Sequence, residues 1–434
     1  MVDSRGKKMS AQETFAQLAQ ASGLRQRLFF TIGILILARL GIYVPLPGIN
    51  QDAFQAATQD NAIIGFLNIF TGGGLSTLGV FALGILPYIN ASIIMQLLVP
   101  VFPKLEDLQK NEGEQGRRQI SQYTRFLSLG WAVIQGAGLA FWIKQFVPDW
   151  GPAFVIQTTL AMTAGAIFVM WLGELITEKG IGNGASLLIF VNIVATLPAA
   201  FSQTFELIQA DSSRIGGTLL LVVVFLAMIV GIVFVQEGIR RIPIISARRQ
   251  VGPRRQSYQQ QQTSYLPLRV NQGGVMPIIF ASSLLFLPAS LAQFTNNPAV
   301  QNFVNFLSPT SWFYTIAYLI LILFFSYFYA SIVINPEDVS KNLKRMGSSI
   351  PGVRPGKATS DYIEQVLNRL TLLGAVFLGI VAVIPTFVEQ ATGITTFNGL
   401  GATSLLILVG VAIDTTKQIQ TYVISQRYEG MVKK

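Results

Sequence analysis

The sequence predicts an all-α membrane protein with ten transmembrane helices. Hydrophobic residues fill 51% of its 434 positions and charged residues only 12%, which is about half the charge of an average soluble chain. Apolar runs of about 20 residues recur along it, each long enough to cross a hydrocarbon core of about 30 Å. The ten expected spans are 28–44, 75–100, 119–143, 154–175, 184–203, 215–236, 271–292, 311–334, 367–388 and 399–420.

The positions of the basic residues predict the orientation of these spans. The chain has 31 Lys and Arg and a net charge of +10, which by itself would also suit nucleic-acid binding. With a cytosolic N-terminus, every Lys and Arg falls on the cytosolic side except Arg39 inside the first span and Lys144 and Arg214 outside. Because this distribution follows the positive-inside rule, both termini are expected in the cytosol. Most of the basic charge then needs no nucleic acid to explain it.

Two segments before the second span, residues 1–27 and 62–72, are not expected to cross the membrane. Residues 1–27 form a polar, weakly amphipathic arm with no cleavable apolar stretch after it, so no signal peptide is expected. Segment 62–72 is apolar but too short to span, and it ends at three glycines, Gly72 to Gly74. It is either a short helix that returns into the protein from outside or an interfacial helix that lies flat.

Two cytosolic loops are longer than a simple connection needs. Loop 237–270 has β-favouring residues on both flanks of a polar middle, which predicts a projecting hairpin. Loop 335–366 contains the turn Ile350 to Gly356, which is rich in Pro and Gly. Their basic residues are compatible with ordinary positive-inside charge beside lipid headgroups. Their length and rigid turns favour the docking of a bulky partner. The basic residues of the first loop include Arg240, Arg241, Arg248, Arg249, Arg254 and Arg255.

A nine-residue segment occurs twice in the chain. Gly84 to Ser92 returns as Gly274 to Ser282 in the pattern G-x-x-P-x-I-x-A-S, at a separation of 190 residues. Duplicated helices interrupted by Gly and Pro are the usual sequence sign of a pathway between two membrane-embedded halves. Coincidence between two kinked apolar helices is the alternative.

The residue types present argue against several kinds of chemistry. The chain has no Cys and no His, so no disulfide, thiol nucleophile, haem ligand or zinc site is expected. It also lacks a G-x-x-x-x-G-K-[S/T] phosphate loop. We therefore expect no catalytic residue, metal or cofactor, and no enzyme activity.

The polar residues in the middles of the expected spans are neutral. Acidic residues near the spans, Glu174, Glu178 and Asp414, lie at expected cytosolic ends. A coupled transporter usually has an ionisable group near the midplane, so this pattern counts against a carrier of small solutes, which remains the main alternative, ahead of a structural scaffold. Interhelical hydrogen bonds would also explain the neutral residues. These are Asn90, Ser92, Gln96, Gln135, Asn192, Ser282 and Ser283.

Seven motifs, taken together and in this order, make the chain resemble SecY, the central subunit of the protein-conducting channel. The resemblance runs from about residue 20 to the C-terminus, and the opening residues resemble those of cyanobacterial members. The motifs are Pro45-Leu-Pro-Gly48, Phe70-Thr-Gly-Gly-Gly74, Leu83-Gly-Ile-Leu-Pro-Tyr-Ile89, Gly116-Arg-Arg-Gln-Ile-Ser-Gln-Tyr-Thr-Arg125, Trp171-Leu-Gly-Glu174, Ile181-Gly-Asn-Gly184 and Pro351-Gly-Val-Arg-Pro-Gly356.

The resemblance implies two halves of five helices, 28–203 and 204–420, related by an inverted repeat around a central pore, with a tail at 421–434. It also implies a ring of six side chains that narrows the pore. A collar of branched apolar side chains is poorly wetted and resists ions, although each isoleucine alone is typical of ordinary core packing. Ala185 is smaller than the bulky residue common at its position. The ring positions are Ile85, Ile89, Ala185, Ile189, Ile279 and Ile407.

The resemblance further assigns segment 62–72 to a plug beneath the ring and the second, third, seventh and eighth spans to a lateral gate toward lipid. Arg254, Arg255 and Arg354 match positions that engage the ribosome or the motor ATPase SecA. The hairpin tip near Gln259–Gln262 is longer than the family pattern implies. The plug residues are Phe66, Leu67, Asn68, Ile69 and Phe70, and the gate residues are Asn90, Gln135, Ser283 and Leu287.

The implied function is the passage of unfolded secretory polypeptides across a membrane and the sideways release of apolar segments into lipid. The implied partners are the small membrane subunits SecE and SecG, SecA, the ribosome, signal peptides, nascent chains and membrane lipid. The implied location is the bacterial inner membrane or the thylakoid membrane.

Overall fold

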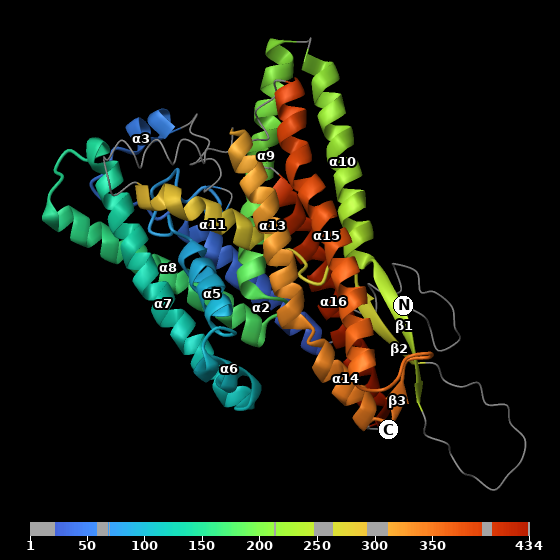
Figure 1. Cartoon of the computed structure of the whole chain (residues 1–434). Coiled ribbons are helices and arrows are strands. Elements are labelled where there is room, and N and C mark those ends of the chain that lie inside the picture. Colours follow the sequence, from blue (N-terminus) through green and yellow to red (C-terminus); the bar gives the residue numbers. More distant parts are fainter. Residues whose placement is uncertain are drawn as a thin grey trace, which may run out of the picture. The chain divides into compact units, whose positions relative to one another are not determined.

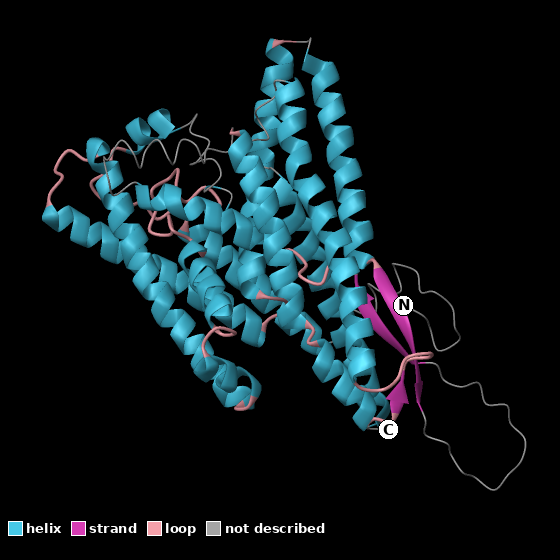
Figure 2. Cartoon of the chain, viewed as in Figure 1, coloured by secondary structure: helices cyan, strands magenta, loops and turns pink. Residues whose placement is uncertain are grey.

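The computed structural model of the chain describes residues 22–58, 68, 70–211, 214–246, 264–292, 311–392 and 402–432. Helices make up almost all of the described part, and the strands form one small sheet (Figure 2). The chain forms two compact units. Unit 1 comprises Met1–Gly216, Phe286–Pro309 and Ile394–Lys434, and unit 2 comprises Gly217–Leu285 and Thr310–Gly393.

In unit 1 a long helix, α7, packs against both α5 and α8, as Figure 1 shows. In turn, α9 packs against α8, and α16 against α9. The helices of this unit are α2 (Ser22–Gly41), α3 (Gln51–Thr58), α5 (Leu86–Leu98), α6 (Pro103–Lys110), α7 (Gly113–Trp142), the 3₁₀ turn η1 (Ile143–Phe146), α8 (Pro152–Lys179), α9 (Gly184–Ala210) and α16 (Ala402–Val432).

The ends of α8 and α9 follow from their sequence. Pro152 opens α8, where a missing backbone N–H costs nothing because the first turn has no partner for it. Gly180 is the residue that ends α8. Asn183 then caps α9, with its side-chain oxygen accepting a hydrogen bond from Ser186 N at 3.2 Å, and such a cap stabilises a helix by about 1 kcal/mol. The two helices are thereby joined by a short, defined turn.

Unit 2 contains most of α10 (Ile215–Glu237) and of α11 (Met276–Ala292). Its helix α13 lies along α15, and α14 packs on α15 (Figure 1). The bounds are α13 (Trp312–Val333), α14 (Pro336–Arg345) and α15 (Lys357–Thr392), with strands β1 (Ile239–Ser246), β2 (Ser264–Arg269) and β3 (Ser348–Ser349).

Each of the ten expected spans overlaps a helix. Within the described residues, six helical stretches are long and apolar enough to cross a membrane, and the bent pair α5 and α6, which turns by 98°, would make a seventh. The count of ten spans therefore stays a prediction. The six stretches are Gly113–Phe146, Pro152–Lys179, Gly184–Ala210, Ile215–Glu237, Trp312–Arg345 and Lys357–Pro385.

The second span was wrongly expected to be helical from residue 75. Its helix α5 begins only at Leu86, and turns with one isolated bridge, Pro45 to Gly79, occupy the stretch before it. Gly72, Gly73 and Gly84 have positive φ angles, as does Leu78 at 43°. Left-handed backbone interrupts a right-handed helix, so an apolar composition alone could not maintain one here.

The hairpin expected in loop 237–270 is confirmed, because β1 and β2 pair as antiparallel strands with Ile239 opposite Arg269. A third strand was not expected. Ile245 and Ser246 of β1 also pair with Ser349 and Ser348 of β3, so the fold is not purely α-helical. The hairpin tip, residues 247–263, lies outside the described residues.

The two long loops share one hydrophobic core. It joins the hairpin to the turn before α15, and all its members are less than one-tenth exposed. This packing makes the loops a folded structure rather than independent connections. Its buried residues are Ile242, Ile244, Leu268, Leu343, Ile350, Ile363, Val366, Leu367 and Leu370.

Candidate functional site

The duplicated segment has the same local structure in both copies. Gly84 has a φ of 52° and Gly274 a φ of 58°. In each copy the helix starts two residues after the glycine, at Leu86 in α5 and Met276 in α11. Proline is the second helical residue both times, where it is well tolerated. The repeat is thus a structural match as well as a sequence match.

Later residues of the two copies also correspond. The Ser92 hydroxyl donates to the Ile89 carbonyl at 2.9 Å, and the Ser282 hydroxyl donates to the Ile279 carbonyl at 3.0 Å. Ile89 and Ile279 are each 6% exposed. The matching helix starts therefore place an isoleucine of the expected ring at the same position in each helix.

Two other ring positions meet at Gly173 of α8. A Cβ on Gly173 would lie 3.5 Å from Ile85 Cδ1 and 3.5 Å from Ala185 N. A Cβ on the neighbouring Gly184 would lie only 1.9 Å from the Gly173 carbonyl oxygen. The backbones of α8 and α9 are thus in contact beside Ala185. The residue at this close contact therefore has a small side chain.

The remaining isoleucines of the expected ring are buried. Ile189 is 2% exposed and lies in α9, one turn after Ala185, while Ile407 is 1% exposed and lies in α16. Five of the six ring positions belong to unit 1, and three of these, Ala185, Ile189 and Ile407, lie on α9 and α16, which pack against each other. Ile279 belongs to unit 2.

The expected plug is described only at its end, since Phe66, Leu67 and Ile69 lie outside the described residues. Phe70 is 3% exposed, and its carbonyl oxygen accepts a hydrogen bond from Asn192 Nδ2 at 2.7 Å. The amide and carbonyl oxygens of Asn68 accept hydrogen bonds from Ser76 N at 3.0 Å and Gly73 N at 3.0 Å. This end of the segment is therefore held in a defined turn.

Three of the four expected gate residues carry polar side chains, and they lie in α5, α7 and α11. Asn90 in α5 is 9% exposed, and Ser283 in α11 is half-buried. Gln135 in α7 has a buried Oε1 without a hydrogen-bond partner among the described residues. Leu287 lies in α11 as well, where its side chain is not described.

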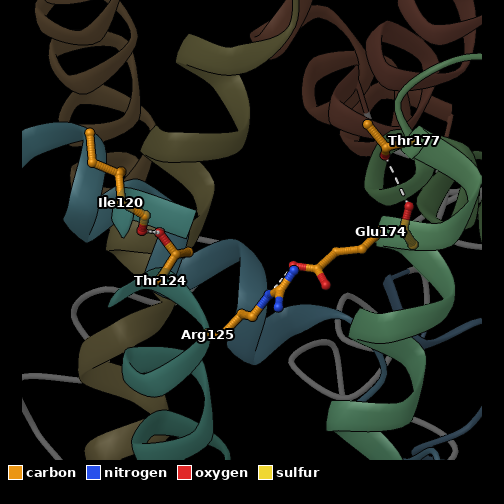
Figure 3. Close-up of polar contacts among 6 residues, drawn as sticks. Ile120, Thr124, Arg125, Glu174 and Thr177 are labelled. Carbon is orange, nitrogen blue, oxygen red and sulfur yellow. Dashed lines mark hydrogen bonds and ion pairs between the residues drawn. The ribbon is translucent and has the colours of Figure 1, made fainter. Parts of the chain in front are cut away.

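An ion pair that the sequence did not predict joins α7 to α8. Figure 3 shows Arg125 reaching toward Glu174, with Nε 2.8 Å from Oε1. Next to it, Thr177 Oγ1 accepts a hydrogen bond from Gly184 N at 2.9 Å and donates to the Gly173 carbonyl at 2.9 Å. Since half of the Arg125 side chain is exposed, the pair itself contributes at most about 1 kcal/mol. Arg125 and Glu174 are the last residues of two of the seven motifs described above. Their place in these motifs is the sequence signal that could have indicated the contact.

One expected docking residue, Arg354, is exposed on a rigid turn. Gly352 and Gly356 on either side have φ angles of 78° and 108°, and the Arg354 carbonyl accepts a hydrogen bond from Thr359 Oγ1 at 2.8 Å. The turn is tied to the shared loop core by Ile350, which is 4% exposed. Arg254 and Arg255 lie outside the described residues.

Among the described residues, no group of three or more acidic side chains is close enough together to hold a metal ion.

Comparison with known proteins gives matches over nearly the whole chain. The family model described as SecY matches residues 79–416. "Protein translocase subunit SecY" of Synechocystis sp. is 66% identical over 100% of both chains. "Preprotein translocase subunit SECY, chloroplastic" of Spinacia oleracea is 46% identical over 92% of this chain and 73% of that protein.

Solved structures share the fold at low sequence identity. A SecY structure, described as one whose plug domain stabilises the closed state of the translocation channel, aligns with a TM-score of 0.67 at 16% identity. The structure of a protein-conducting channel aligns with a TM-score of 0.62 at 17% identity. Each alignment covers 92% of both chains.

Proposed function

The chain belongs to the SecY family, and from this premise we propose that it forms the central channel of a protein translocase. The channel passes unfolded secretory polypeptides across a membrane and releases apolar segments sideways into lipid. The observation that carries the proposal is the matched pair of helix starts, in which Ile89 and Ile279 follow the same glycine and proline and are equally buried.

The proposed architecture has ten spanning helices in two halves of five, with both termini in the cytosol. The matched helix starts lie in different halves of the sequence, as an inverted repeat requires. The distribution of basic residues supports the orientation. In this arrangement the hairpin of β1 and β2 and the turn at Arg354 both face the cytosol.

The proposed ring consists of Ile85, Ile89, Ala185, Ile189, Ile279 and Ile407. A constriction of this composition excludes ions because water enters it poorly. It offers no hydrogen-bond donor, acceptor or charge to a passing chain, so polypeptides of any sequence can slide through. Segment 62–72 acts as the plug that closes the channel at rest.

The proposed lateral gate lies between helices that carry Asn90 and Gln135 and the helix that carries Ser283 and Leu287. Neutral polar side chains at such a seam hold it by hydrogen bonds of modest strength, about 1 kcal/mol each. A seam of that strength can part for an apolar signal helix and close again afterwards.

The proposed partners of the cytosolic loops are the motor ATPase SecA and the ribosome. The exposed Arg354 and the basic hairpin tip, with Arg254 and Arg255, offer positive charge to such partners. The small subunits SecE and SecG complete the channel. The membrane is the bacterial inner membrane or the thylakoid membrane, in keeping with relatives from a cyanobacterium and a chloroplast.

Reconstitution tests this function against transport of small solutes. The purified chain is placed in liposomes with SecE, SecG, SecA and ATP, and a radiolabelled precursor is scored for protection from external protease. We expect protection that depends on SecA and ATP. A chain that transports small solutes by itself, and protects no precursor with the motor present, would contradict the proposal. The relatives above are translocase subunits, not carriers of small solutes.

A further inference from the structure

Two side chains from distant helices hold the backbone where the expected plug ends. Arg39, in α2, donates from Nη1 to the Gly72 carbonyl oxygen at 2.8 Å. Asn192, in α9, donates from Nδ2 to the Phe70 carbonyl oxygen at 2.7 Å. The acceptors are two residues apart and face donors that lie 33 and 122 residues away in the sequence.

Gly72 is the point where the two donors converge. A Cβ there would lie 2.3 Å from Arg39 Nη1 and 2.5 Å from Asn192 Oδ1. Gly72 also has a φ of 65°, which favours glycine for a second reason. The close approach of both side chains therefore requires a residue without a side chain.

The turn does not need these donors for its own shape. Asn68 already accepts from the backbone nitrogens of Gly73 and Ser76, and Leu75 N donates to Thr71 Oγ1 at 3.3 Å. These bonds join residues of the same segment, so they would be kept if the segment moved. The bonds from Arg39 and Asn192 differ because they fix the segment to α2 and α9.

A charged side chain at position 39 has an energetic cost, because the position lies within an expected membrane span. Arg39 lies inside the first expected span, where a charged side chain is rare and usually functional. Among the described residues it forms no ion pair. Its guanidinium instead donates to a backbone carbonyl, and hydrogen bonds from a charged donor are roughly twice as strong as neutral ones.

We propose that Arg39 and Asn192 are positioning residues that fix the backbone of Phe70 to Gly72 to α2 and α9 and so set how readily the resting channel opens. This inference rests on the proposed channel function. Loss of either donor leaves the local turn intact but removes one of the two bonds that fix it to the surrounding helices. The resting channel then opens more often.

The test measures ion conductance of the complete translocase in planar bilayers without precursor. Arg39→Met and Asn192→Leu remove each donor while keeping side-chain bulk. We expect each to raise resting conductance roughly tenfold, from the strength of one buried hydrogen bond to a carbonyl. Asn192→Gln, which keeps an amide donor, and Arg39→Lys, which keeps the charge, should restore most of the seal.

Thr196→Val is the matched control. Thr196 lies one turn from Asn192 in α9, and its hydroxyl donates to the Ile193 carbonyl of the same helix at 2.8 Å. The substitution removes a polar group at nearly the same depth without touching the turn, so conductance should stay at the wild-type level. If Arg39→Met does not assemble, Arg39→Gln replaces it, and an increase smaller than tenfold is expected.

The channel variant with Asn at Ile85, Ile279 and Ile407 serves as the positive control for a leaking pore. If it leaks while the variants at Arg39 and Asn192 conduct no more than wild type, the positioning role is wrong and the channel function stands. The positioning role is equally wrong if those variants only lower the unfolding temperature. If the positive control also fails to leak, the proposed pore itself has failed.

Discussion

Gly84 and Gly274, which are 190 positions apart, have nearly the same left-handed backbone, with φ angles of 52° and 58°. Each ends an irregular stretch and lets a helix begin two residues later with proline at its second position. A nine-residue sequence match thus corresponds to a shared backbone requirement.

The first prediction concerns this backbone requirement. Gly274→Ala should lower the free energy of unfolding by about 1 kcal/mol, because an L-residue in the left-handed region costs about 1–2 kcal/mol and its Cβ would meet no other atom within 4 Å. Gly84→Ala should cost at least as much, since its Cβ would lie 3.4 Å from Thr71 Cα. Unfolding in detergent, followed by circular dichroism, measures both.

Gly130→Ala is the control for this pair. Gly130 lies inside α7 with open space around its Cβ position, so alanine should stabilise the helix there by up to about 1 kcal/mol. A Gly274→Ala variant as stable as Gly130→Ala would mean that the left-handed turn is not required.

The second prediction concerns topology. Reporter fusions made after five residues, one in each expected external segment, should all read as external. The basic residues on the opposite side hold the cytosolic loops in place. A single fusion that reads as cytosolic would contradict both the count of ten spans and the inverted repeat. The fusion sites are Asp60, Asp149, Asp211, Asn296 and Glu389.

The sequence predicted the position of the helices well because apolar runs of membrane length have few alternatives. It failed at residues 75–85, which are as apolar as a helix but follow two residues with positive φ, Gly72 and Gly73, and contain two more, Leu78 and Gly84. It also missed β3, because Ser348 and Ser349 have no strand preference of their own and pair only through β1. Such pairings depend on tertiary contacts that local pattern does not encode.

The candidate site was predictable to different degrees. The repeated glycine and proline were visible in the sequence, whereas the ring isoleucines look like ordinary core residues and were selected by resemblance alone. The contacts of Arg39 and Asn192 were not predictable, since their partners are backbone carbonyls, which every residue has. The pairing of Arg125 with Glu174 joins residues 49 positions apart.

The third prediction concerns docking. Arg354→Glu should weaken binding of SecA or ribosomes by at least tenfold and make it less sensitive to salt, because the reversal removes an attraction and adds a repulsion, both of which salt screens. The fold should persist, since the side chain is exposed and the turn is held by its backbone. Co-sedimentation with ribosomes and SecA binding to proteoliposomes measure the effect.

Arg117→Glu provides the matched charge reversal. Arg117 is also exposed and lies on the expected cytosolic side, near the start of α7. Its reversal changes the net charge equally but should leave docking within twofold of wild type. Equal losses in both variants would show that Arg354 contributes only general charge.

The fourth prediction concerns the lateral gate. The chain has no native cysteine, so an introduced pair reports on proximity alone. Cysteines at Asn90 and at Ser283 or Leu287 should form a disulfide in at least one pairing, which requires Cα atoms within roughly 7 Å. Closing it should stop export until a reductant is added, because a signal helix about 10 Å across must enter through the seam.

Two outcomes of the gate experiment would contradict the assignment. One is that neither pair forms a disulfide under oxidation. The other is that a fully cross-linked channel exports at the wild-type rate. Single-cysteine variants at the same positions, oxidised in parallel, control for effects of substitution.

The most direct test of the channel asks whether a polypeptide passes the ring. Cysteine replaces Ile89 or Ile279 in the ring, or Ile143 as a control, which is fully buried in a core cluster of unit 1. A precursor with one cysteine is arrested halfway by a folded domain at its C-terminus. The account predicts a disulfide between precursor and channel at positions 89 and 279 but not at 143, and only with SecA and ATP. A protected precursor that cross-links to neither ring position, or equally to position 143, would contradict it.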